Sequence, residues 1–401
     1  MKAYIPYRGY YSSPYSRWQG SFQNENSITL AADTAKRWLA SKKWDPMIFD
    51  YLILGITIGQ PWWFYSSPWA ASMMGMGGFD DTGAALSTMT ISQACTTGVT
   101  CLNQAAMGIE TGLYKNVFVL TTDRCSNGQH AVWPNPNGPG GQVTCENWVM
   151  DMFGKDPWAG NAMIKTAEDT AKAFGMTKEE SDAIALRRYE QYMMSLANDR
   201  EFQKRFMFPI EIQMNKKKTI AVDADEGISP TTKEGLAGLK SALPGGVISF
   251  GAQTHPADGN TALVVTTREK VKELSADPKI EIECVSYGYA RAKKGYMAMA
   301  PVSAAQMALD KAGLKITDIK TIKTHNPFTV NDFYMAKTMN INVMSYNNYG
   351  SSLIFGHPQG PTAARCIIEG IEETVIKGGG YLLFTGCAAG DCGASMIFKI
   401  S

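Results

Sequence analysis

Cys95 lies within residues 92–98 (SQACTTG), a segment whose residue types suit a reactive thiol. The preceding residues 84–91 (AALSTMTI) are small, β-branched and apolar, which predicts a buried strand. Apolar residues then recur at helical spacing as far as Leu113, so we expect a helix to begin near Thr96. A thiol at such a turn faces unpaired N–H groups and the positive end of the helix dipole, and both favour the thiolate. The alternative is a small apolar side chain packed beneath the helix, because free cysteines are often buried.

Three more reactive side chains lie in the C-terminal half: His325 in HNPF, His357 in GHPQG and Cys387 in CAAGDCG. His325 and Cys387 follow predicted strands at 319–324 and 381–385, and ligands of open α/β sheets bind where strands end. Imidazole titrates near neutral pH, so a histidine beside a thiol can accept its proton. His357 stands between a glycine and a proline, a poor position for a core residue, which favours a chemical role. For His325 a buried structural histidine is the alternative.

The composition of the 401 residues is that of a globular protein with more than one packed unit, since 45% are apolar and 19% charged. A formal charge of +1 gives no electrostatic footprint for nucleic acid, and no window approaches about eighteen uninterrupted apolar residues. We therefore expect no binding to nucleic acid or to a membrane. No signal peptide is evident, and the eight scattered cysteines lack paired zinc spacing. These features predict a cytoplasmic protein with free thiols and no metal in this chain.

Alternating strand and helix patterns predict an α/β fold with two related halves. An offset of 264 residues takes the strand at Val117 to the strand at Tyr381. The same offset takes Cys95 to Gln359, two residues beyond His357. Such a duplication would bring reactive side chains of both halves to one crevice.

The predicted units are an N-terminal half, residues 1–123; an inserted, mostly helical subdomain, 124–243; return strands of the N-terminal half, 244–270; and a C-terminal half, 271–401. A loop rich in proline and glycine at 133–141 and helical patterns at 162–174 and 178–198 mark the inserted subdomain. The return strands are expected at 246–250 and 260–267.

The densest aromatic cluster, at residues 60–69, includes Trp62 and Trp63. Most such clusters belong to a core or a subunit interface. A pocket for an aromatic ring is the other interpretation.

The motifs of Cys95, His325, His357 and Cys387, in this order and with the inserted subdomain, resemble the thiolase superfamily. The resemblance implies two duplicated βαβαβαββ halves packed as an α/β/α/β/α five-layer sandwich. It also implies thiolytic cleavage of a 3-ketoacyl-CoA, with coenzyme A as co-substrate. By this resemblance Cys95 is the nucleophile that carries the acyl group, and His357 takes its proton. Cys387 is then the acid/base for the α-carbon and the incoming coenzyme A, and His325 is an oxyanion-hole donor.

Some residues depart from the family's pattern. His325 begins HNPF where most members have Asn-Glu-Ala-Phe, and its histidine is similar to the sterol-carrier branch. That branch can carry its acid/base cysteine where this chain has Pro327, so Cys387 must supply the second thiol. Thr254 stands where a serine is usual, in a loop that resembles the pantetheine-side loop, and Gly390 lies in an altered glycine-rich motif. We expect both residues to contact substrate.

The N-terminal arm and the cluster with Trp62 and Trp63 are similar to thiolase subunits of anaerobic toluene degradation. Those subunits cleave (S)-2-benzoylsuccinyl-CoA to benzoyl-CoA and succinyl-CoA. This narrower resemblance implies that Trp62 or Trp63 helps to seat a phenyl ring. It further implies a homodimer of this chain and a small partner subunit with a zinc ribbon and an OB-like fold, to which any zinc would belong.

Several alternatives remain: an acetoacetyl-CoA or sterol-carrier-type thiolase, a condensing enzyme, and a non-catalytic acyl-CoA-binding subunit of a complex. Condensing relatives usually lack a second thiol, and Cys387 provides one. Non-catalytic relatives usually lose at least one polar side chain of the site. This chain keeps all four of the side chains that carry the resemblance.

Overall fold

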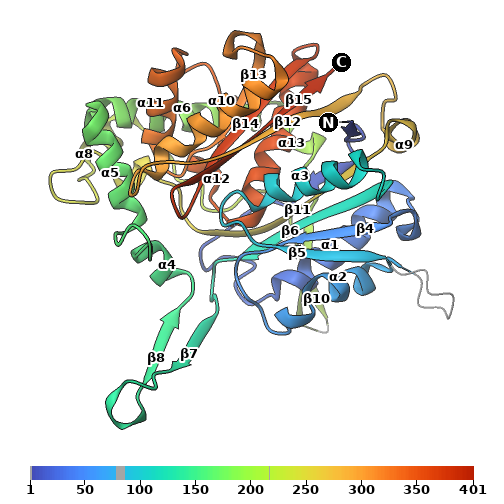
Figure 1. Ribbon diagram of the computed structural model, residues 1–401, viewed down its shortest axis with the longest axis horizontal. Helices are drawn as coiled ribbons and strands as arrows, with labels where there is room; N and C mark the ends of the chain where they lie inside the picture. The colour runs from blue at the N-terminus through green and yellow to red at the C-terminus, as the bar shows by residue number, and fades with distance from the viewer. Residues whose placement is uncertain (1, 78–85, 216) are drawn as a thin grey trace.

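The computed structural model describes residues 2–77, 86–215 and 217–401 (Figure 1). Within this part of the chain, one 11-stranded sheet runs through both halves. Its strands follow the order β13-β14-β15-β12-β1-β11-β6-β4-β5, and β2 and β3 pair with β11. Their bounds are β1 (Ala3–Tyr4), β2 (Tyr10–Ser12), β3 (Ser16–Arg17), β4 (Tyr51–Gly55), β5 (Ser87–Ile91), β6 (Asn116–Arg124), β11 (Ala257–Thr266), β12 (Ile282–Arg291), β13 (Ile319–His325), β14 (Gly380–Ala388) and β15 (Cys392–Ile400).

The two halves repeat one strand arrangement. In the first half β4 is parallel to β5 and β6, and β11 closes the arrangement antiparallel to β6. In the second half β13 is parallel to β14, and β15 is antiparallel to β14. The short β1 joins the halves, since it pairs with both β11 and β12. Of the buried strand predicted at 84–91, residues 84 and 85 lie outside the described residues, and residues 87–91 form β5. The prediction of burial is wrong, because β5 is an edge strand and each of its residues is exposed or half-buried.

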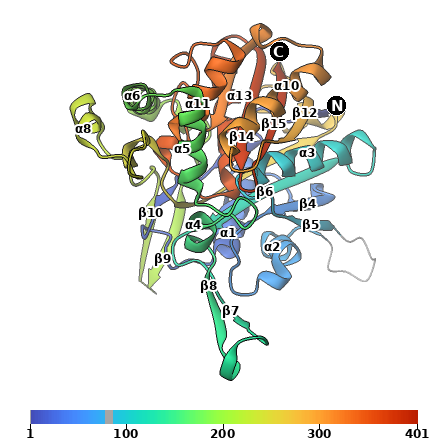
Figure 2. The ribbon, with the colours of Figure 1, turned by 60° about the vertical axis from the view of Figure 1, so that its left-hand side comes forward.

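Helices cover the outer face of each half of the sheet and also lie between the two halves, which gives the five layers that the family resemblance implies (Figures 1 and 2). α1 (Ser27–Lys42) and α2 (Ser66–Met74) pack on the outer side of the N-terminal half. α3 (Thr97–Glu110) and α13 (Gly360–Ile376) lie in the central layer, and each contacts strands of both halves. α10 (Ala300–Ala312) covers the outer side of the C-terminal half.

The central helices meet near their N-termini. A Cβ atom at Gly98 would lie 2.8 Å from the backbone nitrogen of Ala364. Only a residue without a side chain therefore allows the first turn of α3 to approach α13 this closely. The apolar stripe of α13, which includes Ile367 and Ile371, is completely buried. This packing fixes the segments that precede α3 and α13, and these segments carry Cys95 and His357.

The inserted region combines helices with two hairpins. The predicted helices at 162–174 and 178–198 are observed as α5 (Met163–Phe174) and α6 (Lys178–Ser195). The hairpin of β7 (His130–Pro134) and β8 (Val143–Asn147) projects from the body in both views, and β9 (Ile210–Asn215) pairs with β10 (Lys218–Val222). The other helices are α4 (Met150–Gly154), α7 (Ala197–Arg200), α8 (Lys233–Gly238), α9 (Arg268–Leu274), α11 (Thr329–Met339) and α12 (Ser352–Phe355).

Residues 246–250, predicted as a strand, form an irregular segment with one isolated bridge, from Ser249 to Ser241, and the start of a short 3-10 helix instead. The carboxylate of Glu168 accepts hydrogen bonds from the backbone N–H groups of Val247 and Ile248. Buried backbone N–H groups need hydrogen-bond acceptors, but these need not be the carbonyl groups of a neighbouring strand. Here a side chain of the inserted region supplies the acceptor. Among the described residues, no helix combines the length and the apolar character needed to cross a membrane.

Candidate active site

Cys95 occupies the tight turn between β5 and α3. The turn needs a positive φ of 46° at Ala94, a conformation that costs free energy in any residue with a side chain. Thr97 stabilises it from both sides, because its hydroxyl donates to the carbonyl of Ala94 at 2.7 Å and accepts from the N–H of Gln93 at 2.8 Å. The turn thereby presents the Cys95 thiol ahead of the first helical residues.

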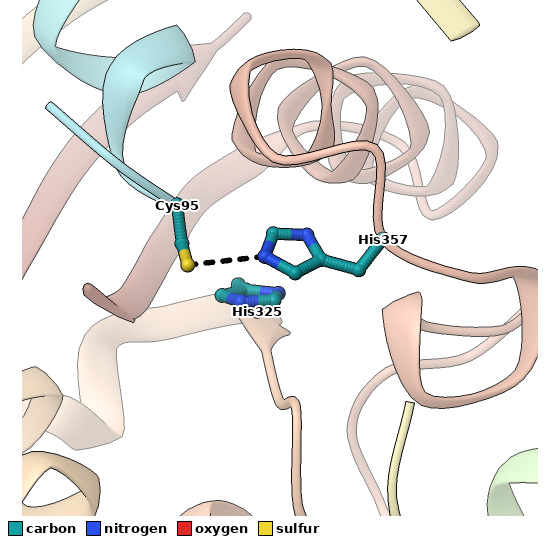
Figure 3. Close-up of side chains that lie close together, drawn as sticks. All are labelled: Cys95, His325 and His357. Carbon is teal, nitrogen blue, oxygen red and sulfur yellow. Dashed lines mark hydrogen bonds between the residues drawn. The ribbon is translucent and has the colours of Figure 1, made fainter. Parts of the chain in front are cut away.

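His357 meets this thiol directly (Figure 3). Its Nε2 lies 3.0 Å from Cys95 Sγ, and its Nδ1 lies 2.6 Å from Oγ1 of Thr362 in the first turn of α13. The backbone N–H of His357 donates to the carbonyl of His255 at 2.9 Å. The ring is therefore held at both nitrogens, and with the proton on Nδ1 its Nε2 can accept the thiol proton.

The ring of His325 lies beside that of His357, with 4.1 Å between the ring centroids and an angle of 34° between the planes (Figure 3). Its Nδ1 lies 2.8 Å from Oγ of Ser352, whereas its buried Nε2 has no hydrogen-bond partner among the described residues. The Ser352 hydroxyl accepts from the N–H of Asn326 at 3.2 Å, and its own proton has two acceptors within reach, Nδ1 of His325 at 2.8 Å and the side-chain oxygen of Asn326 at 3.3 Å. The hydroxyl proton is thus directed to the closer acceptor, Nδ1, which leaves the ring proton on Nε2. An unpartnered N–H of this kind is a donor for a substrate oxygen.

A buried ion pair supports the loop that carries His325. Asp332 accepts hydrogen bonds from Arg188 at 2.9 Å, Asn326 at 2.6 Å and the Thr324 hydroxyl at 2.8 Å. The side chains of both Arg188 and Asp332 have no exposed surface. The inserted region therefore contributes a charge that fixes the segment on both sides of His325.

Cys387 stands near the end of β14, which is the neighbour of the strand that ends at His325. Its thiol is buried and accepts a hydrogen bond from Nδ2 of Asn331 at 3.3 Å. Burial raises the pKa of this thiol well above its usual value, and the proximity of Cys95 adds to the rise. Asp391, the unusual acidic residue of the same motif, is an anchor, because its carboxylate accepts from the N–H of Gly295 at 2.8 Å.

The thiol of Cys95 is protonated in the resting site. Burial raises its pKa to about 12, although the backbone N–H groups of Ala389 and of Cys95 itself lower it. The prediction that the helix terminus would favour the thiolate is therefore wrong, because desolvation has the larger effect. Burial also lowers the pKa of His357 well below its usual value and that of His325 to about 3. A neutral thiol beside a neutral imidazole is a nucleophile with its base in place.

A cavity of about 680 Å³ opens onto Cys95 and His357. Its wall is mainly apolar, and the larger side chains in it are Trp148, Met150, Met152, Phe153 and Phe250. None of the described residues that line the cavity is a lysine or an arginine. This volume and lining suit a thioester arm with an uncharged acyl group.

The predicted substrate-contacting residues lie in different places. Thr254 lines the cavity, and its hydroxyl donates to the carbonyl of Ser352. Gly390 is absent from the cavity lining, and its N–H donates to Asp156 at 3.2 Å. Trp62 lines a separate surface depression and is 71% exposed, and Trp63 is also exposed. Neither tryptophan is brought to the cavity of Cys95.

Some residues of the site carried no signal of their own in the sequence. Gln359 places Oε1 3.3 Å from Cys95 Sγ; it lies in the GHPQG motif of His357, but only the 264-residue offset pointed to its pairing with Cys95. Ser352 and Asn331 contact His325 and Cys387, but neither lies in a motif.

The sulfur of Cys95 and the nitrogens of His325 and His357 lie within 4.8 Å of one another. Geometry alone would allow these three donors to bind a soft metal ion such as Zn²⁺. Coordination would occupy the sulfur and the nitrogen that the hydrogen bond joins. The arrangement is better explained as a nucleophile, its base and an oxygen-binding donor.

Comparison with protein families gives matches along nearly the whole chain. Residues 10–269 match the family model described as "Thiolase, N-terminal domain", and residues 278–400 match "Thiolase, C-terminal domain". An acetyl-CoA acetyltransferase of Syntrophomonas wolfei is 28% identical over 324 residues, which cover 77% of this chain and 78% of the relative. A probable acetyl-CoA acetyltransferase of Mycobacterium leprae is 25% identical over 395 residues, or 96% of this chain and 97% of the relative.

Solved structures give the same result. The acetyl-CoA acetyltransferase of Bacillus anthracis has a TM-score of 0.89 and 25% identity, with 100% of this chain and 99% of that chain covered. Human mitochondrial 3-ketoacyl-CoA thiolase in complex with CoA has a TM-score of 0.86 over 100% of this chain and 98% of that chain, and at 23% identity it shows likeness of fold.

Proposed function

The chain belongs to the thiolase family of CoA-dependent acyltransferases, and from this premise we propose that it cleaves a 3-ketoacyl-CoA through an acyl-Cys95 intermediate. The observation that carries the proposal is the 3.0 Å contact between Cys95 Sγ and His357 Nε2 on the wall of a cavity that can hold a thioester. Because the thiol pKa is about 12, Cys95 becomes a nucleophile only as it gives its proton to His357.

The first half-reaction breaks the carbon–carbon bond. The Cys95 sulfur attacks the 3-keto carbonyl while its proton passes to His357. The tetrahedral adduct collapses, and the electron pair of the broken bond moves into the enolate of the leaving thioester. The N–H on Nε2 of His325 donates to the enolate oxygen, and the thiol of Cys387 protonates the α-carbon.

The second half-reaction transfers the acyl group to CoA and regenerates the free enzyme. The Cys387 thiolate takes the proton of an incoming CoA thiol, and the CoA sulfur attacks the acyl group on Cys95. Cys95 leaves as a thiolate and regains its proton from the imidazolium of His357. Thr254, on the cavity wall, is the proposed contact for the pantetheine arm. The proposal assigns no contact to Gly390, whose N–H is paired with Asp156.

We further propose an aromatic acyl group, with 2-benzoylsuccinyl-CoA as the substrate of choice. The support is the cavity itself, whose lining includes Trp148, Phe153 and Phe250. These side chains replace Trp62 and Trp63 as the proposed seat of a phenyl ring. The succinyl carboxylate finds no lysine or arginine among the described lining residues, so it must reach solvent or a second subunit.

Steady-state thiolysis of 2-benzoylsuccinyl-CoA and acetoacetyl-CoA by the same preparation tests the substrate. We expect kcat/KM for the aromatic substrate to be at least about tenfold higher, which is the discrimination that about 1.4 kcal/mol of differential burial gives. Equal or higher kcat/KM for acetoacetyl-CoA would exclude the aromatic assignment and favour the activity for which the relatives are named. Absence of thiolysis with both, together with tight acyl-CoA binding, would favour a non-catalytic subunit.

The proposed assembly is a homodimer that also binds a small zinc-ribbon subunit in the cytoplasm. Its support is an exposed aromatic run in which Trp62 is 71%, Phe64 89% and Tyr65 57% exposed, because clustered exposed aromatics are typical of interfaces. All eight cysteines are free, which suits a reducing compartment. Native mass spectrometry of the purified chain tests the assembly, and a monomer at micromolar concentration would contradict the homodimer.

A further inference from the structure

Gln359 corresponds to Cys95 under the 264-residue offset between the two halves, and it immediately precedes α13. Its backbone has φ 62° and ψ −97°, a conformation that L residues rarely adopt. The side chain is only 7% exposed and forms part of the cavity wall. The fold therefore holds a polar amide, at some conformational cost, beside the nucleophile.

Neither end of the amide has a hydrogen-bond partner of its own in the resting site. Its Oε1 lies 3.3 Å from Cys95 Sγ, whose single proton is closer to His357, and its Nε2 is buried with no partner among the described residues. Unmade hydrogen bonds of buried polar groups are destabilising, so a residue selected for structure alone would be expected to pair both ends. The position of Oε1 beside the reacting sulfur indicates a role in the chemistry.

The environment of His357 shows what this role is. Burial, the ring of His325 and the ring of His255 all lower the pKa of His357, whereas the side chain of Gln359 raises it. Among the described residues no carboxylate contacts Nδ1, which lies against the hydroxyl of Thr362 instead. Gln359 is therefore the neighbour that favours the imidazolium that the reaction must form.

We propose that Gln359 is a further catalytic residue, whose Oε1 accepts the hydrogen bond of the Nε2–H of His357 once Cys95 is acylated. In the resting site the thiol proton lies toward Nε2, the closer acceptor at 3.0 Å. After proton transfer Nε2 becomes a donor, and a thioester sulfur is a much weaker acceptor than the thiolate that preceded it. Oε1 then takes the place of the sulfur and holds the imidazolium until the proton is returned.

Two substitutions separate this role from a structural one. Gln359→Leu removes the acceptor, and Gln359→Glu keeps an oxygen at the same place and adds a charge. The inference rests on the proposed roles of Cys95 and His357, so wild-type acylation of Cys95 is measured first by mass spectrometry of the intact protein. If the wild type forms no acyl-enzyme, the proposed function fails, and the effect of Gln359 on His357 is then measured by the pH dependence of Cys95 alkylation.

For Gln359→Leu we expect single-turnover acylation to slow about ten- to hundredfold, with KM changed less than about threefold. The apparent pKa of the base in the pH–rate profile should fall by about one unit. Gln359→Glu should raise this pKa above that of the wild type. A leucine variant that acylates at the wild-type rate with an unshifted profile would overturn the proposal. So would equal losses in both variants with no shift in either profile.

Discussion

Ser352→Ala tests whether the tautomer of His325 is set by its neighbour. The Ser352 hydroxyl has no exposed surface, lies 2.8 Å from Nδ1 of His325 and accepts from the N–H of Asn326 at 3.2 Å. The substitution leaves both buried groups without this partner. Each unmade hydrogen bond costs about 1–3 kcal/mol, so we expect the two together to lower stability by about 2–6 kcal/mol, and we expect a ring that no longer favours a proton on Nε2.

The expected effect on turnover follows from the donor that is lost. Removal of one oxyanion donor reduces kcat by about 10²–10³ in enzymes that depend on it. Ser352→Ala only weakens the preference for the donating tautomer, so kcat should fall by about ten- to hundredfold, with KM little changed. His325→Ala removes the donor itself, so kcat should fall further in this variant. The assay is the initial rate of 3-ketoacyl-CoA thiolysis at saturating substrate.

Ser351→Ala is the matched control. Its hydroxyl is buried in the adjacent position but has no hydrogen-bond partner among the described residues. Removal of this group should change kcat less than about twofold and stability by less than about 0.5 kcal/mol. A folded Ser352→Ala variant with wild-type kcat would refute the tautomer argument. Equal losses in the two variants would refute it as well, because only one of them contacts His325.

Two further predictions concern stability. Asp332→Ala leaves Arg188 buried without its carboxylate and should lower the free energy of unfolding, measured in urea, by about 3–5 kcal/mol. The control is Asp33→Ala, which removes the part-exposed ion pair with Arg37 and should lower the same free energy by about 1 kcal/mol or less. Equal effects of the two substitutions would contradict the importance of burial. The pKa of His325 is about 3 in the folded state and 6.5 in the unfolded state, so the unfolded state binds more protons below pH 6.5 and stability falls as pH decreases toward 3. Because of this histidine the free energy of unfolding should be about 2 kcal/mol lower at pH 5 than at pH 7. His325→Asn should remove that part of the pH dependence. Urea titrations of both proteins at the two pH values would measure it.

The sequence pointed to the proposed site residues because each stands in a short motif, and two of these motifs contain a glycine with a structural reason. Gly98 marks the start of a helix that another element approaches, and Gly356 precedes His357 with a positive φ of 91°. The apolar strand runs and the duplicated pattern indicated an α/β fold with two related halves, and the five layers were implied by the family resemblance. Ser352 carried no such mark, because its contact with His325 joins positions 27 residues apart through tertiary packing.

Two other differences have physical causes that local pattern does not contain. The helix terminus at Cys95 was expected to favour the thiolate, but the depth at which the turn is buried decides the pKa. Residues 246–250 have strand-like composition, yet the carboxylate of Glu168 satisfies their backbone N–H groups and no neighbouring strand is needed. Both outcomes depend on which distant segment packs against the site.

The most direct test of the account is the mass of the protein after brief exposure to a 3-ketoacyl-CoA without free CoA, followed by peptide mapping. We expect one acyl group on the peptide that contains Cys95 and its loss in Cys95→Ser. Cys387→Ala lacks the acid for the leaving enolate, so the 3-ketoacyl-CoA should leave its Cys95 unmodified. A simple acyl-CoA, whose CoA thiolate can leave without that acid, should still acylate Cys95 of this variant. An acyl group found on Cys387 or on another cysteine, with none on Cys95, would contradict the assignment of the nucleophile.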